Sequence, residues 1–184
     1  RGWGNGLERR GEVRRCGMGG CAILTGVPTG CLCRTVGLRM QKRRPGAILL
    51  GAGYDEADRL GAEYIRSHDM TKIDAYYDDP KVYGGQGTVG LEIIRQNPDI
   101  DTIVVPVGGG GLITGIAVAV KSVRPDIRVI GVQTEACPAM VRALEDRIFY
   151  EEYPVTGDTV CDALVGGVGK LSYEMLADYV DDMI

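Results

Sequence analysis

The chain has 184 residues, 45% apolar and 25% charged, which can bury one core but is short for a two-domain enzyme, so we expect part of a larger protein. Its formal net charge of −4, with no basic stripe beyond the N-terminal stretch, argues against nucleic acid as a partner. No run of about 18 apolar residues could span a membrane and no segment resembles a signal peptide, so we expect a cytoplasmic protein without a membrane partner.

Residues 1–34 are rich in glycine, arginine and cysteine, and apart from the short apolar run Cys21–Leu24 they show no helix or strand periodicity. A shifted reading frame, an assembly error or strong divergence would give this composition, and a disordered tail is a second interpretation. A zinc site is a third, but the cysteine spacings match no common ligand pattern, and the single histidine, His68, lies far along the chain. The four cysteines of this stretch are Cys16, Cys21, Cys31 and Cys33.

Seven segments between residues 47 and 133 carry strand or helix patterns. The predicted strands are Ala47–Leu50, Ile73–Tyr76, Thr102–Val107 and Arg128–Gln133. The predicted helices are Tyr54–Ser67, Gln86–Asn97 and Leu112–Val123. The last helix is apolar all round, which predicts deep burial with Gly115 as a packing contact. Strand, crossover helix and strand within about 30 residues indicate a βαβ unit. We therefore predict an α/β fold, a parallel sheet with flanking helices.

The glycine-rich loop after the third of these strands is the most informative motif. The strand leads into four consecutive glycines, Gly108, Gly109, Gly110 and Gly111, and then into Leu112 at the start of a helix. Glycines there suit a main chain that must approach a ligand closely. Free backbone N–H groups and the positive end of the helix dipole favour a phosphate. The carboxyl end of a strand is also where open α/β sheets bind ligands.

Two common nucleotide-binding motifs do not explain this loop. The dinucleotide spacing G-x-G-x-x-G fails because Ile113 and Thr114 stand where the third glycine belongs. That spacing does occur at Gly85, Gly87 and Gly90, but the preceding residues indicate a turn rather than an apolar strand, so we interpret this match as a decoy. No lysine follows a glycine pair at the distance that a P-loop requires.

Several segments together resemble the threonine and serine dehydratase branch of fold-type II pyridoxal-phosphate enzymes. They are Gly51–Ala57, Tyr76–Pro80, Gly85–Ile93, Gly108–Leu112 and Asp162–Gly166. The string GQGT-x-GLEI followed by PVGGGGL is the specific core of this resemblance, which covers residues 35–184. It implies the tryptophan synthase β-like architecture. Residues 35–83 would then be a remnant of the small domain and 84–184 part of the large phosphate-binding domain, with 1–34 as the anomalous or disordered stretch.

The resemblance implies pyridoxal 5'-phosphate as the cofactor, with its phosphate held by the backbone of Gly108–Leu112. It also implies a lysine that forms a Schiff base with the cofactor, in a Ser-x-x-Lys type of stretch before the matched region. We expect that this lysine is not in the chain. The sequence therefore identifies no catalytic residue, and we expect the chain by itself to be inactive. We expect the five lysines present to be solvated surface charges: Lys42, Lys72, Lys81, Lys121 and Lys170. Only Lys170, which follows a glycine-rich loop, is a candidate for another role.

Two further positions depart from the family's pattern. Ala163 stands where the family usually has a glycine beside the cofactor ring, so the methyl group is either tolerated or narrows the pocket. Gln133 stands where some members have an acidic residue that binds a divalent cation, and a neutral amide is a poor ligand for such a cation. Glu135 could substitute, but an exposed loop carboxylate is the simpler interpretation, so we predict no metal site.

The activity implied is β-elimination, in which threonine or serine loses its α-proton and its β-hydroxyl and hydrolysis yields a 2-oxo acid and ammonia. A β-replacement synthase or an amino-acid racemase of the same fold would use the same phosphate loop. A non-catalytic module that binds a phosphate ligand is the alternative from a different class. The implied partners are a small amino-acid substrate and, in the complete enzyme, further copies of the same chain.

Overall fold

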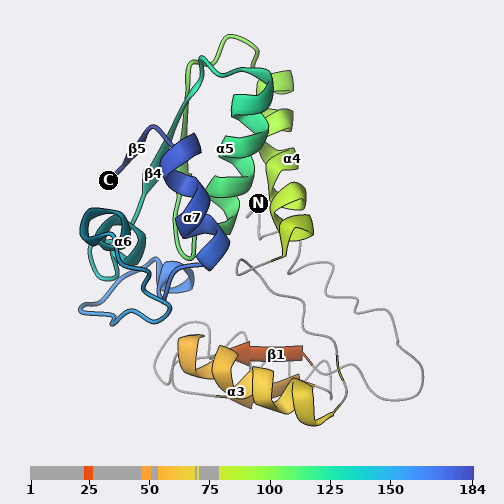
Figure 1. The fold of residues 1–184 in the computed structure, drawn as a ribbon, viewed down its shortest axis with the longest axis vertical. Helices are drawn as coiled ribbons and strands as arrows, with labels where there is room; N and C mark the ends of the chain where they lie inside the picture. Colours follow the sequence, from red (N-terminus) through yellow and green to blue (C-terminus); the bar gives the residue numbers. More distant parts are fainter. Residues whose placement is uncertain (1–22, 27–46, 51–53, 69, 71–78) are drawn as a thin grey trace. The chain divides into compact units, whose positions relative to one another are not determined.

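The computed structural model describes residues 23–26, 47–50, 54–68, 70 and 79–184 (Figure 1). They belong to two compact units, residues 1–70 and 71–184, each with a sheet of its own. No helix within these described ranges is long and apolar enough to cross a bilayer. The predicted strand Ile73–Tyr76, most of the stretch 1–34 and its four cysteines lie outside the described residues.

The first unit contains a two-stranded parallel sheet and a helix. β1 (Ile23–Gly26) pairs with β2 (Ala47–Leu50), and α3 (Tyr54–Ser67) follows. Acidic residues in the first turn of α3 and Arg66 in its last turn complement the helix dipole. His68 stacks on a tyrosine of α3, with the ring centroids 3.9 Å apart. The bounds of β2 and α3 confirm the predictions made from the sequence.

Three parallel strands form the sheet of the second unit. β4 (Arg128–Val132) lies between β3 (Thr102–Pro106) and β5 (Asp182–Met183). Side chains alternate between the two faces of β3, so Val105 is 2% exposed whereas its neighbour Val104 is 60% exposed. The pairing of β3 with β4 confirms the predicted parallel sheet. Each of these two strands ends one residue before its predicted end.

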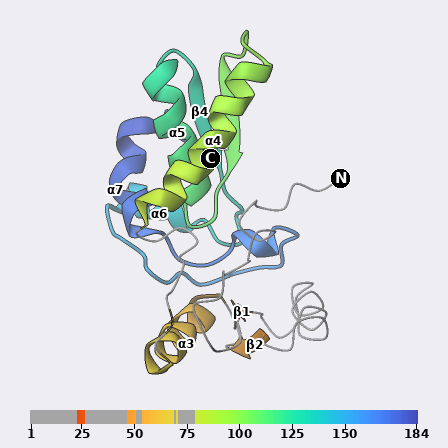
Figure 2. The same cartoon turned by 90° about the vertical axis from the view of Figure 1, so that its right-hand side faces the viewer.

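Three helices of the second unit pack together beside this sheet (Figures 1 and 2). α5 (Gly111–Val123) contacts β3, β4 and two further helices, α4 (Pro80–Gln96) and α7 (Lys170–Tyr179). The predicted deep burial of α5 is confirmed, since its side chains at Ile113 and Val120 are fully buried in the core.

The start of α4 differs from the prediction. The sequence predicts a turn around Asp79 and a helix from Gln86, but α4 begins at Pro80. Asp79 caps the helix, and its carboxylate accepts a hydrogen bond of 2.9 Å from the Lys81 N–H. Proline suits the first helical position, because the N–H that it lacks would have no intrahelical partner there. The prediction of a turn is therefore wrong, since Asp and Pro here mark a helix start.

The glycines of the G-x-G-x-x-G match lie inside α4, two of them against α5. Gly87 and Gly90 are buried, and a Cβ atom at Gly87 would lie 2.8 Å from the Gly115 carbonyl oxygen. A Cβ atom at Gly115 would lie 2.5 Å from the Tyr83 carbonyl oxygen, so the two helix backbones touch where side chains are absent. Gly85 has open space at its Cβ position. The segment is a helix-packing contact, which confirms the packing role of Gly115. The interpretation of the G-x-G-x-x-G match as a decoy stays a prediction, which its place inside a helix supports.

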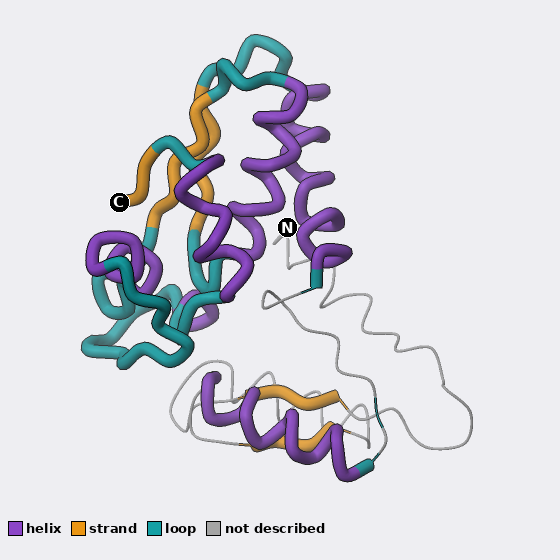
Figure 3. Tube along the Cα trace, viewed as in Figure 1, coloured by secondary structure: helices purple, strands orange, loops and turns teal. Residues whose placement is uncertain are grey.

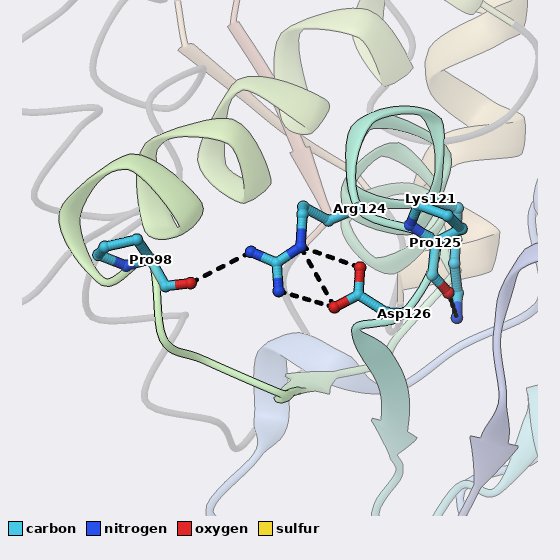
Figure 4. A network of polar contacts seen from close by, with 5 residues as sticks. All are labelled: Pro98, Lys121, Arg124, Pro125 and Asp126. Carbon is cyan, nitrogen blue, oxygen red and sulfur yellow. Dashed lines mark hydrogen bonds and ion pairs between the residues drawn. The ribbon is translucent and has the colours of Figure 1, made fainter.

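Polar contacts hold the end of α5 that lies away from the glycine loop (Figure 4). Arg124 donates to the Asp126 carboxylate at 2.9 and 2.7 Å and to the Pro98 carbonyl at 3.1 Å. Lys121 forms an ion pair of 2.8 Å with Asp181, whose carboxylate also accepts a hydrogen bond of 2.7 Å from a backbone N–H of β4. The hydrogen bond from Lys121, followed by that from β4, holds the pKa of Asp181 below its usual range.

A long irregular segment connects α6 (Ala139–Asp146) to α7, as the loop colour in Figure 3 shows. It contains a single 3-10 turn, η1 (Asp162–Leu164). Cys137, just before α6, is fully buried, and its Sγ donates a hydrogen bond of 3.5 Å to the Gly166 carbonyl oxygen. This contact fixes the segment against the start of α6.

Candidate phosphate-binding site

The predicted glycine loop lies where β3 ends and α5 begins. α5 starts at Gly111, one residue before the predicted start at Leu112, and Gly110 is its N-cap residue. Gly110 has a φ of 97°, a left-handed conformation that favours glycine. Because Gly110 has no side chain, it provides no side-chain acceptor for the N–H groups in the first turn of α5.

The carbonyl groups of the loop are tied back into the protein. Three of them accept hydrogen bonds, of 3.3, 2.8 and 3.0 Å: Gly108 from Gln133 Nε2, Gly109 from the Gly169 N–H and Gly110 from the Thr114 N–H. In contrast, no acceptor within the described ranges takes a hydrogen bond from the N–H groups of Gly109–Leu112. The loop therefore keeps its acceptors engaged and its donors open, which suits an anion.

The inner side of the loop leaves no room for a side chain at Gly110. A Cβ atom there would lie 2.6 Å from both Met140 Cε and Ser172 Cβ. Ser172 is fully buried, and its hydroxyl shares a hydrogen bond of 2.8 Å with the Tyr83 hydroxyl. Residues of α4, α6 and α7 thus support the loop from within. Sequence reasoning missed these residues, because their contacts join positions that are far apart in the chain.

One buried hydroxyl near the loop has no partner. Thr114, in the first turn of α5, is 1% exposed, and its Oγ1 is the one buried side-chain polar atom without a hydrogen bond in the part of the chain that the structure describes. A bound phosphate group fits three features of this loop: its open N–H groups, its place at a helix start, and Gly110, where only a hydrogen atom has room.

The second predicted cofactor segment lies against the loop. Ala163 is an exposed residue of η1. Its neighbour Leu164 makes the contact, since a Cβ atom at Gly108 would lie 3.2 Å from Leu164 Cα. The structure therefore brings η1 and the glycine loop, which are far apart in the sequence, to the same edge of the sheet.

Gln133 follows β4 directly and is hydrogen-bonded at both ends of its amide. Its Oε1 accepts hydrogen bonds of 2.9 and 3.1 Å from the N–H groups of Met140 and Val141, and its Nε2 faces the glycine loop. Glu135 is exposed, as predicted. Among the residues that the structure describes, no group of three His, Cys, Asp or Glu side chains could hold a metal ion. The absence of a metal site stays a prediction.

Three of the five lysines lie in the described residues. Lys81 and Lys170 are exposed, and Lys170 is the first residue of α7. The side chain of Lys121 is only 18% exposed and pairs with Asp181, so the prediction that it is a solvated charge is wrong. Lys42 and Lys72 lie outside the described residues. No described lysine is thus placed at the glycine loop by a contact.

Comparisons with known proteins agree on the kind of protein that carries this loop. The profile of a family described as pyridoxal-phosphate dependent enzyme matches residues 33–184. The L-threonine ammonia-lyase of Thermotoga maritima is 46% identical over 149 residues, which cover 74% of this chain and 34% of that protein. The structure of threonine deaminase isoform 2, processed form, from Solanum lycopersicum matches with a TM-score of 0.70 and 31% identity, over 86% of this chain and 43% of that one. Maize serine racemase matches with a TM-score of 0.65 and 27% identity, over 80% of this chain and 45% of that one. The chain spans less than half the length of each of these relatives.

Proposed function

Because the chain belongs to the pyridoxal-phosphate dependent enzyme family, we propose that Gly108–Leu112 bind the phosphate of pyridoxal 5'-phosphate. The observation that carries this proposal is the row of N–H groups at Gly109–Leu112 that donate to no described acceptor, at the start of the buried helix α5. Ala163 is the second cofactor-binding position, because η1 contacts Gly108 through Leu164. The bound cofactor supplies an electron sink for charge that develops on the substrate.

We propose that the complete enzyme acts on threonine or serine by β-elimination. The α-proton and the β-hydroxyl leave the amino acid, and hydrolysis gives a 2-oxo acid and ammonia. The support is the relatives named as L-threonine ammonia-lyase and threonine deaminase, at 46% and 31% identity. The contribution of this chain is to bind and orient, since the loop N–H groups and the α5 dipole stabilise the phosphate charge. A racemase is the alternative, because maize serine racemase shares the fold at 27% identity.

The test requires the complete protein that contains residues 1–184. Supplied with pyridoxal 5'-phosphate, it is expected to release ammonia and a 2-oxo acid from threonine or serine, followed with a coupled dehydrogenase. Chiral analysis of the remaining amino acid tests the alternative, since inversion without 2-oxo acid formation would favour a racemase. A complete protein that shows no absorbance change with the cofactor would overturn the proposal and favour a module for another phosphate ligand.

We also propose that the lysine that attaches the cofactor lies outside these 184 residues. Lys81 and Lys170 are exposed, and Lys121 is engaged with Asp181. The isolated chain, mixed with pyridoxal 5'-phosphate and reduced with borohydride, should therefore show no stoichiometric label on one lysine and no turnover of serine or threonine. A single labelled lysine together with turnover would contradict this part of the proposal.

The remaining parts of the proposal rest on the sequence. They are a domain division at 35–83 and 84–184, a homo-oligomeric complete enzyme, a cytoplasmic location, a small amino-acid substrate and no nucleic-acid partner. The net charge of −4 supports the last of these. Size-exclusion chromatography with light scattering on the complete protein would test the oligomeric state.

A further inference from the structure

Gln133 joins the glycine loop to the start of α6. It is half-buried at the carboxyl end of β4, and its own N–H donates to the Ile184 carbonyl at 2.8 Å. Its side-chain oxygen accepts from two backbone N–H groups of α6, at 2.9 and 3.1 Å. Its side-chain nitrogen donates to the Gly108 carbonyl at 3.3 Å. One amide therefore contacts two elements that both border the candidate site.

The contact with α6 supplies a cap that the helix otherwise lacks. The N-cap residue of α6 is Pro138, which makes no side-chain hydrogen bond. The N–H groups of Met140 and Val141 belong to the first turn and have no intrahelical partner. Gln133 Oε1 accepts from both of them, so the residue that follows β4 performs the role that serine or aspartate usually performs at an N-cap.

This cap also decides the orientation of the Gln133 amide. Two N–H donors face one end of the amide, so that end must be the oxygen, and the NH2 group must point the other way. The group on that side is the Gly108 carbonyl, an acceptor that suits it. A glutamate would satisfy α6 equally well, since a negative charge is favourable at a helix N-terminus, but it has no donor for Gly108.

We propose that Gln133 is a positioning residue that sets the phosphate-binding loop by holding the Gly108 carbonyl to the start of α6. α6 also carries Met140, whose Cε lies 2.6 Å from the Cβ position of Gly110, so the same helix supports the loop at a second point. The carbonyls held in this way keep the N–H groups of Gly109–Leu112 on the open side. This inference rests on the proposed function, because it assigns the loop to a phosphate.

Two substitutions in the complete protein separate the contact with the loop from the cap. Gln133→Glu keeps the acceptor for α6 and removes the donor to Gly108. Gln133→Met, which has a similar length and no charge, removes both and controls for repulsion between a carboxylate and the phosphate. Gln96→Glu, at an exposed position near the end of α4, is the matched control for an added charge. We expect both Gln133 variants to weaken binding of pyridoxal 5'-phosphate about 10-fold or more and binding of pyridoxal, which lacks the phosphate, much less.

Hydrogen exchange in the cofactor-free protein is the second measurement. The N–H groups of Val107 and Thr114 are hydrogen-bonded at the two ends of the loop, and we expect faster exchange there in both Gln133 variants. The N–H groups of α6 should exchange faster in Gln133→Met alone. Unchanged loop exchange, or unchanged cofactor affinity in either variant, would overturn the inference. An equal loss of affinity for pyridoxal and its phosphate would also overturn it. A wild-type protein that binds no cofactor would instead refute the proposed function, and loop exchange would still decide the role of Gln133.

Discussion

Two glycine-rich segments of this protein look alike in sequence and differ in structure. Gly84–Gly90 carries the spacing G-x-G-x-x-G but lies within α4, where the backbone N–H groups are used inside the helix. Gly108–Gly111 lacks that spacing but lies between β3 and the start of a buried helix, with its N–H groups open. In the first segment, the absence of side chains lets α4 approach another helix closely. In the second, it lets the chain turn and leaves backbone N–H donors open. Glycine spacing alone therefore does not identify a phosphate loop.

The largest effect is expected at Gly110. An alanine there would adopt a left-handed conformation at a φ of 97° and place a Cβ atom 2.6 Å from Ser172 Cβ. We expect Gly110→Ala to destabilise the complete protein by about 3 kcal/mol and to lower cofactor affinity about 10-fold or more. Denaturant unfolding and cofactor titration measure the two effects. Gly157→Ala is the control, because its Cβ would meet only Ala136 Cβ at 3.9 Å. Equal stability of the two variants would contradict the loop geometry.

A smaller loss is expected where the two helices cross. A Cβ atom at Gly115 would lie 2.5 Å from the Tyr83 carbonyl oxygen and 2.9 Å from the Gly87 nitrogen, and backbone atoms cannot move aside as a flexible side chain can. We expect Gly115→Ala to destabilise the protein by about 2 kcal/mol, although alanine has the higher helix propensity. Urea unfolding measures this loss. A variant as stable as the wild type would show that α4 and α5 do not touch at this point.

The same comparison shows which parts of the fold the sequence could predict. Apolar periodicity located β2, α3, β3, α5 and β4 to within one residue. It failed at the start of α4, because Asp79 followed by Pro80 is typical both of turns and of capped helix starts, and local sequence does not separate the two.

The candidate site was predictable in its loop and not in its supports. The four glycines could be recognised because they stand between a predicted strand and a predicted helix. Ser172 and Tyr83 share a hydrogen bond across 89 positions of the chain, and Gln133 reaches Gly108 across 25. Such contacts leave no periodic signal, because they depend on how the elements pack. For Gln133 one local signal existed, since α6 begins after a proline that cannot cap it.

A substitution at the end of α5 that lies away from the glycine loop would test whether stability and cofactor binding are separable. The ion pair with Lys121 and the β4 hydrogen bond keep the pKa of Asp181 low in the folded protein. The stabilisation is therefore complete above the unfolded pKa of about 3.9 and is lost as the pH falls through the lower folded value. We expect Asp181→Asn to destabilise the protein by about 1 kcal/mol at pH 7 and less as the pH falls below about 4. Thermal unfolding from pH 7 to pH 3 measures this change. An equal deficit at all pH values, or a loss of cofactor affinity at pH 7, would contradict the prediction.

The smallest effect is expected at Gly84, an exposed glycine of α4, where a substitution should raise the stability of the protein instead of lowering it. Gly84 is exposed, lies inside the helix and has nothing within 4 Å of its Cβ position. Gly84→Ala should stabilise the protein by about 0.5–1 kcal/mol, because alanine loses less backbone entropy in a helix and meets no neighbour here. Three residues along the same helix, Gly87→Ala should destabilise it, since that Cβ would lie 2.8 Å from the Gly115 carbonyl oxygen. The two variants differ only in which side of α4 receives the methyl group, so denaturant unfolding of the pair isolates packing from helix propensity. If both changes were stabilising, the buried glycines would not be needed for the crossing with α5, and the interpretation of this segment as a helix contact would fail.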